Sequence, residues 1–214
     1  MKNKIIAIDK RHLKKLIELE IKNNGYKCDL NHIDVSQIED MSSIFSDSWF
    51  NGDISGWDVS NTTNMEFMFY NSKFNGNISQ WNVSNVRVMN SMFGKSKFNG
   101  DISNWNVSNL TTMHCMFSEA EFNSNISKWN VTKVRNMENM FSWSKFDKDI
   151  SDWQPYDLKK VFNYFYACPA PIPYWIKYTN IFERNKAIKS IALKKEIDIE
   201  LAQTNHIKSK PVKI

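Results

Sequence analysis

The residues from Phe50 to Phe146 repeat one pattern with a period of 24 residues. Each of four consecutive units begins F-N-[GS]-[DN]-I-S, continues as W-[DN]-V-[ST] and ends in M-x-x-M-F. A period between about 20 and 50 residues is typical of folds in which similar units stack along one axis and bury a shared core. This repeat therefore constrains the fold more than any other feature of the sequence.

The pattern continues in both directions beyond these four units. Stepping back 24 residues from Val59 reaches Val35, and Tyr26 then takes the place of Phe50. A last unit follows the clear repeats and consists of Phe146, Ile150, Trp153, Val161, Tyr164 and Phe165. The sequence thus predicts six stacked coils over residues 26–169, with degenerate first and last members.

Two local periodicities alternate within each unit. Trp57 and Val59 are two residues apart, which is the spacing of one face of a strand. Met65, Met68 and Phe69 follow the spacing of one face of a helix. We therefore expect an α/β fold, a leucine-rich-repeat-like solenoid whose coils each contain a short parallel strand and a short helical turn.

The two ends of the chain differ from the repeat. Residues 10–22 place apolar side chains at helical spacing, with Asp9 as a candidate N-cap and Gly25 as a candidate stop. Because the first coil of a solenoid has one uncovered apolar face, we interpret residues 1–25 as a capping helix. Residues 170–214 are expected to form a C-terminal cap and a basic tail, with a helix over 179–196 and a strand-like alternation at 196–201.

The repeating unit F-N-x-x-I-S-x-W-x-V-S-N-x-x-x-M-x-x-M-F resembles the BspA-type leucine-rich-repeat family, and the resemblance covers residues 26–165. Members of that family are largely surface or secreted proteins that act in adhesion and protein binding. The chain is most similar to small members on phages and mobile elements that carry no export signal. That resemblance implies a protein partner inside the cell.

Charge and cysteine content narrow the functional classes. Residues 1–25 carry a net charge of +4 and residues 170–214 a net charge of +5, which leaves −4 on residues 26–169. A nucleic-acid-binding solenoid needs a basic track along its face, so this distribution disfavours that role. The three cysteines have no disulfide or metal-ligand spacing. With no secretory apolar region and no apolar run long enough for a membrane span, we expect a cytoplasmic protein that is not bound to membranes.

No motif in the sequence predicts catalysis. A phosphate-binding glycine loop and the signatures of hydrolases and metalloproteases are missing from the sequence. His114 and Cys115 are adjacent, so on a helical turn their side chains are expected to point in different directions. We therefore predict a protein without catalytic residues, metal or cofactor.

Positions where the repeat is broken are the better candidates for function. Phe67, Tyr70 and Trp143 stand where the equivalent residues of other units are small or polar, and aromatic residues are enriched at binding hot spots. The alternative is that these rings pack under flanking segments. A second candidate surface is an amide-rich strip of strand positions, formed by Gln80, Asn82, Asn104, Asn106, Lys128 and Asn130.

The sequence therefore favours a non-enzymatic module that recognises another protein. The sharpest version of this hypothesis is an intracellular inhibitor of a host or anti-phage defence protein. An adhesin-type surface repeat protein is one alternative. Weak nucleic-acid binding through the basic ends is another.

Overall fold

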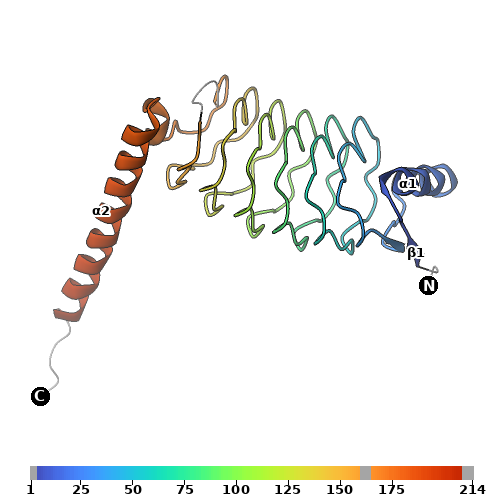
Figure 1. The fold of residues 1–214 in the computed structure, drawn as a ribbon, viewed down its shortest axis with the longest axis horizontal. Coiled ribbons are helices and arrows are strands. Elements are labelled where there is room, and N and C mark those ends of the chain that lie inside the picture. Colours follow the sequence, from blue (N-terminus) through green and yellow to red (C-terminus); the bar gives the residue numbers. More distant parts are fainter. Residues whose placement is uncertain (1–3, 160–164, 209–214) are drawn as a thin grey trace, which may run out of the picture.

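The computed structural model describes residues 4–159 and 165–208. In Figure 1 the chain winds into a row of similar loops that lies between helix α1 and helix α2. Each loop corresponds to one 24-residue unit, which we call a coil. The first coil is 26–49, and the later coils begin at Phe50, Phe74, Phe98, Phe122 and Phe146.

Helix α1 (Lys10–Asn24) lies at the N-terminal end of the row. The Asp9 side chain caps its first turn, and Gly25, at a φ of 79°, ends it. This confirms the predicted helix and both of its predicted ends. Leu13 and Ile17 are buried in the same apolar core as the coils, so the helix covers part of the apolar end of the row.

The only strands in the described residues are β1 (Ile5–Ile6) and β2 (Ile33–Asp34), which pair in parallel. Ile33 occupies the Trp57 position of the first coil, but the W-x-V segments of later coils form no strand in the described residues. The Trp57 backbone N–H donates within its own coil, to the Ile54 carbonyl at 3.1 Å, just as the Ile33 N–H donates to the Leu30 carbonyl at 2.9 Å. What distinguishes Ile33 is the β1 segment beside it, whose Ile5 and Ala7 N–H groups donate to the His32 and Asp34 carbonyls, each at 2.9 Å.

The M-x-x-M-F segments form hydrogen-bonded turns rather than a turn of helix. The Phe67 and Phe69 N–H groups donate to carbonyls of the next coil, each at 2.9 Å. The Met68 N–H donates within its own coil, to the Met65 carbonyl at 3.2 Å. Because every second N–H is directed out of the segment, the consecutive i→i−4 bonds of an α-helix cannot form. One-residue parallel bridges precede these turns and run through Asp40, Asn64, Val88, Thr112 and Asn136.

Identical side chains stack directly on one another in the core. The Phe93 and Phe117 ring centroids are 5.7 Å apart, with planes inclined by 3°. The Trp105 indole N–H donates to the Ile78 carbonyl of the preceding coil at 3.1 Å, and the other four tryptophans at this position make the equivalent bond. The repeated letters of the sequence are therefore mainly packing residues.

The end coils depart from this regular packing. Tyr26, in the place of the buried Phe50, is 52% exposed, because no earlier coil stands against it. In the last coil Phe165 stacks on Phe141 at 5.6 Å. Val161 and Tyr164, which were predicted to fill the same coil, lie outside the described residues.

A short 3-10 helix, η1 (Tyr174–Lys177), and the long helix α2 (Ile181–Lys208) follow the coils. Trp175 and Ile188 are buried where these elements meet the coils, and α2 then extends away from them (Figure 1). The predicted strand at 196–201 is wrong, because this stretch is part of helix α2. Within the described ranges, neither helix has the length and hydrophobicity needed to cross a bilayer.

Candidate functional site

Two residues of each turn segment adopt positive φ. They are the third and seventh residues counted from the first Met of M-x-x-M-F. Phe67 is a third residue, with a φ of 54°, and Trp143 is a seventh residue, with a φ of 59°. Equivalent positions in other coils hold residues such as Ser43 and Asn71. The left-handed region costs a bulky residue about 1–2 kcal/mol. The hydrogen bonds between coils hold these two positions in the left-handed conformation. Phe67 and Trp143 therefore occupy positions where a bulky side chain is locally unfavourable.

The structure places the three aromatic residues singled out from the sequence on one edge of the stack, in two separate pairs. The Phe67 and Tyr70 rings meet edge to face, with centroids 5.6 Å apart. Trp143 meets Tyr166 in the same way at 5.3 Å. Trp143 is 63% exposed and Tyr166 61% exposed, so the second pair is not covered by a flanking segment. We call these four residues the aromatic edge.

Tyr166 is the member of this edge that sequence reasoning missed. It lies four repeat lengths after Tyr70 and so occupies the same position of its coil. Serine or glycine fills this position in the coils between them, at Gly94, Ser118 and Ser142. Extending the comparison of repeat positions into the degenerate last coil would have found it.

Small residues form the floor between the two aromatic pairs. A Cβ atom added to Gly94 would lie 3.1 Å from the Tyr70 ring, so Tyr70 leans over the next coil. Near the other pair is a cavity of about 400 Å³. Its lining consists of Cys115, Ser118, Asn139, Ser142, Trp143 and Tyr166. The edge thus offers a shallow surface with an aromatic pair at each end.

His114 and Cys115 lie beside this floor and correct one expectation from the sequence. Their side chains do not diverge, since the Cys115 Sγ and His114 Nε2 atoms are 3.2 Å apart. The φ of 53° at Cys115 turns the chain so that neighbouring side chains meet. Burial, followed by the charges of Glu138 and Glu119, raises the pKa of the Cys115 thiol. A nucleophilic cysteine needs a lowered pKa, so this environment works against thiolate chemistry.

Metal-binding geometry is also missing from the described part of the chain. No group of three or more His, Cys, Asp or Glu side chains gathers there as a metal site. Cys115 and Cys168 are half-buried and form no disulfide within the described ranges, and Cys28 is buried.

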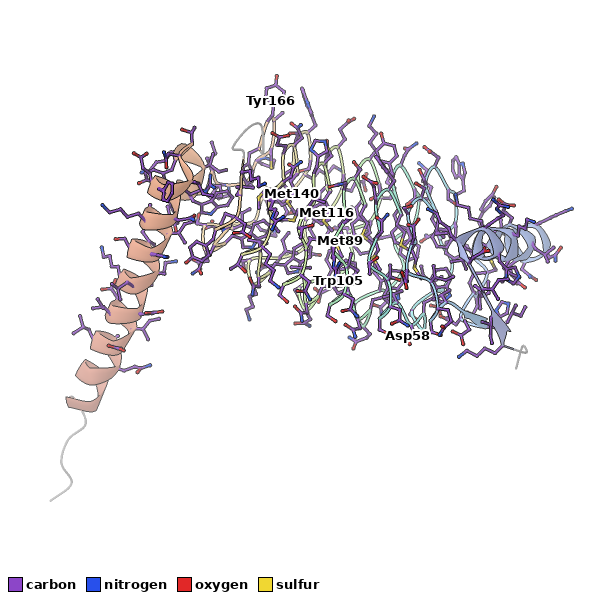
Figure 2. The ribbon with its side chains drawn as sticks, viewed as in Figure 1. Asp58, Met89, Trp105, Met116, Met140 and Tyr166 are labelled. Atoms are coloured by element: carbon purple, nitrogen blue, oxygen red, sulfur yellow. The ribbon has the colours of Figure 1, made fainter. Side chains whose placement is uncertain are left out.

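The amide-rich strip lies on the opposite edge of the stack. Figure 2 shows Tyr166 at one long edge and Asp58, which shares its position in the repeat with Asn82, at the other. All six candidate residues of the strip, which are Gln80, Asn82, Asn104, Asn106, Lys128 and Asn130, are exposed. The aromatic candidates and the amide candidates therefore do not form one continuous site.

Three of the strip's asparagines have a structural role within their own coils. The Asn82 and Asn106 Oδ1 atoms accept the N–H of the serine two residues later, at 3.2 and 3.1 Å. Asn130 accepts from the Thr132 N–H at 3.2 Å. Such Asx turns fix the local backbone. This explains the repeated amides without a partner and makes the aromatic edge the stronger candidate.

Comparison with known families gives one finding. A family model described as "Mycoplasma protein of unknown function, DUF285" matches residues 12–121 and 73–172. Two overlapping matches to one model are what a repeated sequence produces. No curated protein and no solved structure matches the chain.

Proposed function

The chain belongs to the DUF285 family, and we propose that it is a non-enzymatic module that recognises another protein through its aromatic edge. The observation that carries this proposal is the exposure of Trp143 and Tyr166 at one end of a floor of small side chains. Exposed large aromatics are enriched among the residues that dominate binding energy at protein interfaces.

The geometry of the two aromatic pairs supports a preorganised binding surface. Each ring is held edge to face by its neighbour, so little side-chain entropy is lost when a partner binds. Lys95 lies 6.0 Å from the Tyr70 ring and pairs with Glu119 at 3.5 Å. These charges lie between the aromatic pairs and give the surface the polar surroundings that a protein interface has.

We infer that the coils form a leucine-rich-repeat-like solenoid related to the BspA-type family, because equivalent residues stack at every interface. We further propose that the partner is met in a reducing compartment such as the cytoplasm, where an inhibitor of a host or defence protein would act. Cys115 and Cys168, which form no disulfide within the described ranges, support this placement.

The test exchanges the aromatic residues for residues that the chain itself uses at the same positions. Phe67→Ser copies Ser91, Tyr70→Ser copies Ser118, and Trp143→Asn copies Asn71. The triple variant should keep the wild-type melting temperature and lose the protein that wild type captures from a native lysate, as measured by mass spectrometry. Capture of the same protein by the triple variant at wild-type yield would overturn the assignment.

A matched control removes exposed side chains from the opposite edge. A variant carrying Gln80→Ala, Asn104→Ala and Lys128→Ala should capture the partner as wild type does. Cell fractionation distinguishes the adhesin alternative, since recovery of the chain at the cell surface would contradict a cytoplasmic partner.

A further inference from the structure

From the first Met to the seventh residue of each turn segment, the described backbone hydrogen bonds between coils run in one direction. In each interface, N–H groups of one coil donate to carbonyls of the next coil. For example, the Phe45 N–H donates to the Met68 carbonyl at 2.9 Å, and the Asp47 N–H donates to the Tyr70 carbonyl at 2.8 Å. Each coil therefore presents a row of carbonyl acceptors toward the N-terminal end of the stack.

The first coil has this acceptor row but no coil before it. Its Ile44 and Ser46 carbonyls are equivalent to those of Met68 and Tyr70, and no N–H or side chain in the described ranges donates to them. Helix α1 covers this end, but its backbone cannot supply donors, because the N–H groups in the middle of a helix are used within the helix. Its Lys10 side chain donates to the Asp40 and Ser42 side chains instead of to these carbonyls. Two backbone acceptors at this end thus lack the donors that fill the same row in the second to fifth coils.

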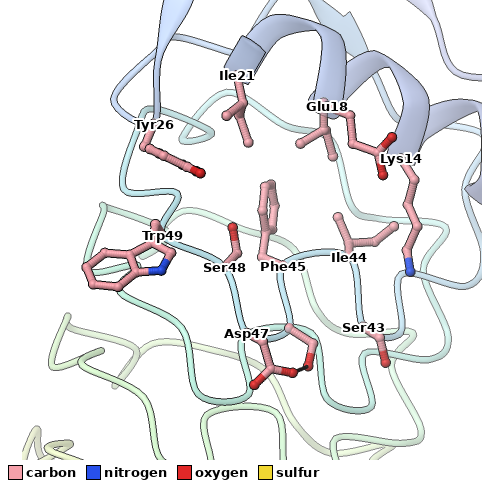
Figure 3. Close-up of a pocket in the computed structure, with 12 residues that line it drawn as sticks. Lys14, Glu18, Ile21, Tyr26, Ser43, Ile44, Phe45, Asp47, Ser48 and Trp49 are labelled. Atoms are coloured by element: carbon pink, nitrogen blue, oxygen red, sulfur yellow. Dashed lines mark hydrogen bonds between the residues drawn. The ribbon is translucent and has the colours of Figure 1, made fainter.

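A groove lies in front of these acceptors, between α1 and the 43–49 segment (Figure 3). Its volume is about 340 Å³, which is at the lower end of the range for ligand sites. In Figure 3 Ile21 faces it from α1 and Phe45 from the first coil, with Tyr26 and Trp49 together at one side. The groove therefore combines backbone acceptors with an apolar wall and an aromatic rim.

Trp49 is a further position at which the repeat is broken. The equivalent residues are Lys73, Lys97, Glu121 and Lys145. Trp49 is 65% exposed, and the Lys73 Nζ atom lies 5.0 Å from its ring centroid. This large exposed ring stands at a position that is charged in the four following coils, and it lies at the rim of this groove.

We propose that the groove binds an extended segment of a partner protein, whose alternate backbone N–H groups donate to the Ile44 and Ser46 carbonyls. The other interfaces of the molecule show what such an edge accepts, namely a chain segment that donates from every second residue. Addition of a segment to an unpaired backbone edge is an established mode of peptide recognition. This site is separate from the aromatic edge and does not depend on its function.

The test starts from a phage-displayed random dodecapeptide library selected on the full-length chain. Selected peptides are synthesised, and their affinities are measured by fluorescence anisotropy. Each peptide is then remade with a single N-methyl group at successive positions, which removes one backbone donor at a time. Two positions that are two residues apart should each lose about tenfold in affinity, while the position between them changes by less than about threefold.

Variants of the protein separate this groove from other surfaces. Trp49→Lys copies the residue found in the next coil, so it should keep the fold and weaken the peptide by at least about fivefold. The Phe67, Tyr70 and Trp143 triple variant should bind the peptide as wild type does, so the two proposals fail independently. The proposal is overturned if no peptide is enriched, if N-methylation has no alternating effect, or if Trp49→Lys binds normally. It is also overturned if sedimentation shows that a second copy of the chain occupies the groove.

Discussion

Replacing Trp105 with phenylalanine removes one hydrogen bond from the middle of the stack and puts a smaller ring in the same buried position. The indole N–H donates to the Ile78 carbonyl of the preceding coil at 3.1 Å, and the side chain is buried. The Ile78 carbonyl also accepts from the Trp81 backbone N–H at 3.2 Å. The substitution therefore leaves that carbonyl with one bond rather than none.

The expected loss of stability follows from these contacts. A buried hydrogen bond whose acceptor keeps a second donor contributes about 1 kcal/mol. The smaller ring leaves a void between coils, which costs roughly another 1 kcal/mol because the rigid stack cannot collapse around it. The free energy of unfolding should fall by about 2 kcal/mol, which for a chain of this size lowers the melting temperature by roughly 4–8 °C.

Urea unfolding monitored by near-ultraviolet circular dichroism measures this loss. Trp81→Phe and Trp129→Phe provide internal replicates, since their N–H···O distances are 3.2 and 3.1 Å. The control is Trp143→Phe, at a site that is 63% exposed, which should change stability by less than about 0.5 kcal/mol. A Trp105→Phe loss below about 0.5 kcal/mol, or an equal loss at Trp143, would refute the reasoning.

Two further predictions concern a glycine and the acid stability of the chain. Gly52→Ala should cost more than about 2 kcal/mol, because a Cβ there would lie 2.0 Å from the Cys28 carbonyl oxygen. Gly100→Ala, at a position that Ser124 fills in the next coil, should cost less than half as much, and equal losses in urea would contradict this. Backbone and side-chain hydrogen bonds lower the pKa of Asp34 to about 2, so its stabilising effect is present above its unfolded pKa and is lost as pH falls from about 4 toward 2. Asp34→Asn should flatten the melting temperature over that pH range, and an unchanged slope would show that other groups control it.

Much of the core could be predicted from the sequence because the repeat position determines the environment. Residues in one position of the repeat have the same neighbours above and below them, so an apolar identity that recurs every 24 residues must lie inside. Phe93 and Phe117 follow this rule. The rule fails for Tyr26, since the first coil has a neighbour on one side only.

The local elements could not be predicted in the same way. The spacing of Met65, Met68 and Phe69 fits a helix, but the same spacing also fits a turn that places all three side chains inside. Which of the two forms depends on where the N–H groups of Phe67 and Phe69 go, and they go to another coil. A pattern of side chains does not contain that information.

For the candidate site too, the sequence predicted which residues stand out but not how they are arranged in space. The sequence marked Phe67, Tyr70 and Trp143 as departures from the repeat, but it could not tell that they share an edge with Tyr166 or that the amide strip lies on the opposite edge. It also could not reveal the groove at the first coil, because unfilled backbone acceptors have no signature in side-chain letters.

The sequence by itself determined that similar coils repeat every 24 residues, which side chains fill the core and where the departures from the repeat occur. Those features depend on side-chain identity and spacing, which the sequence states directly. The tertiary structure alone decided the backbone of each turn, the meeting of His114 with Cys115 and the open acceptor row at Ile44 and Ser46. These depend on hydrogen bonds and contacts made across coils. At the N-terminal end they depend on a helix whose own backbone N–H groups are used within the helix.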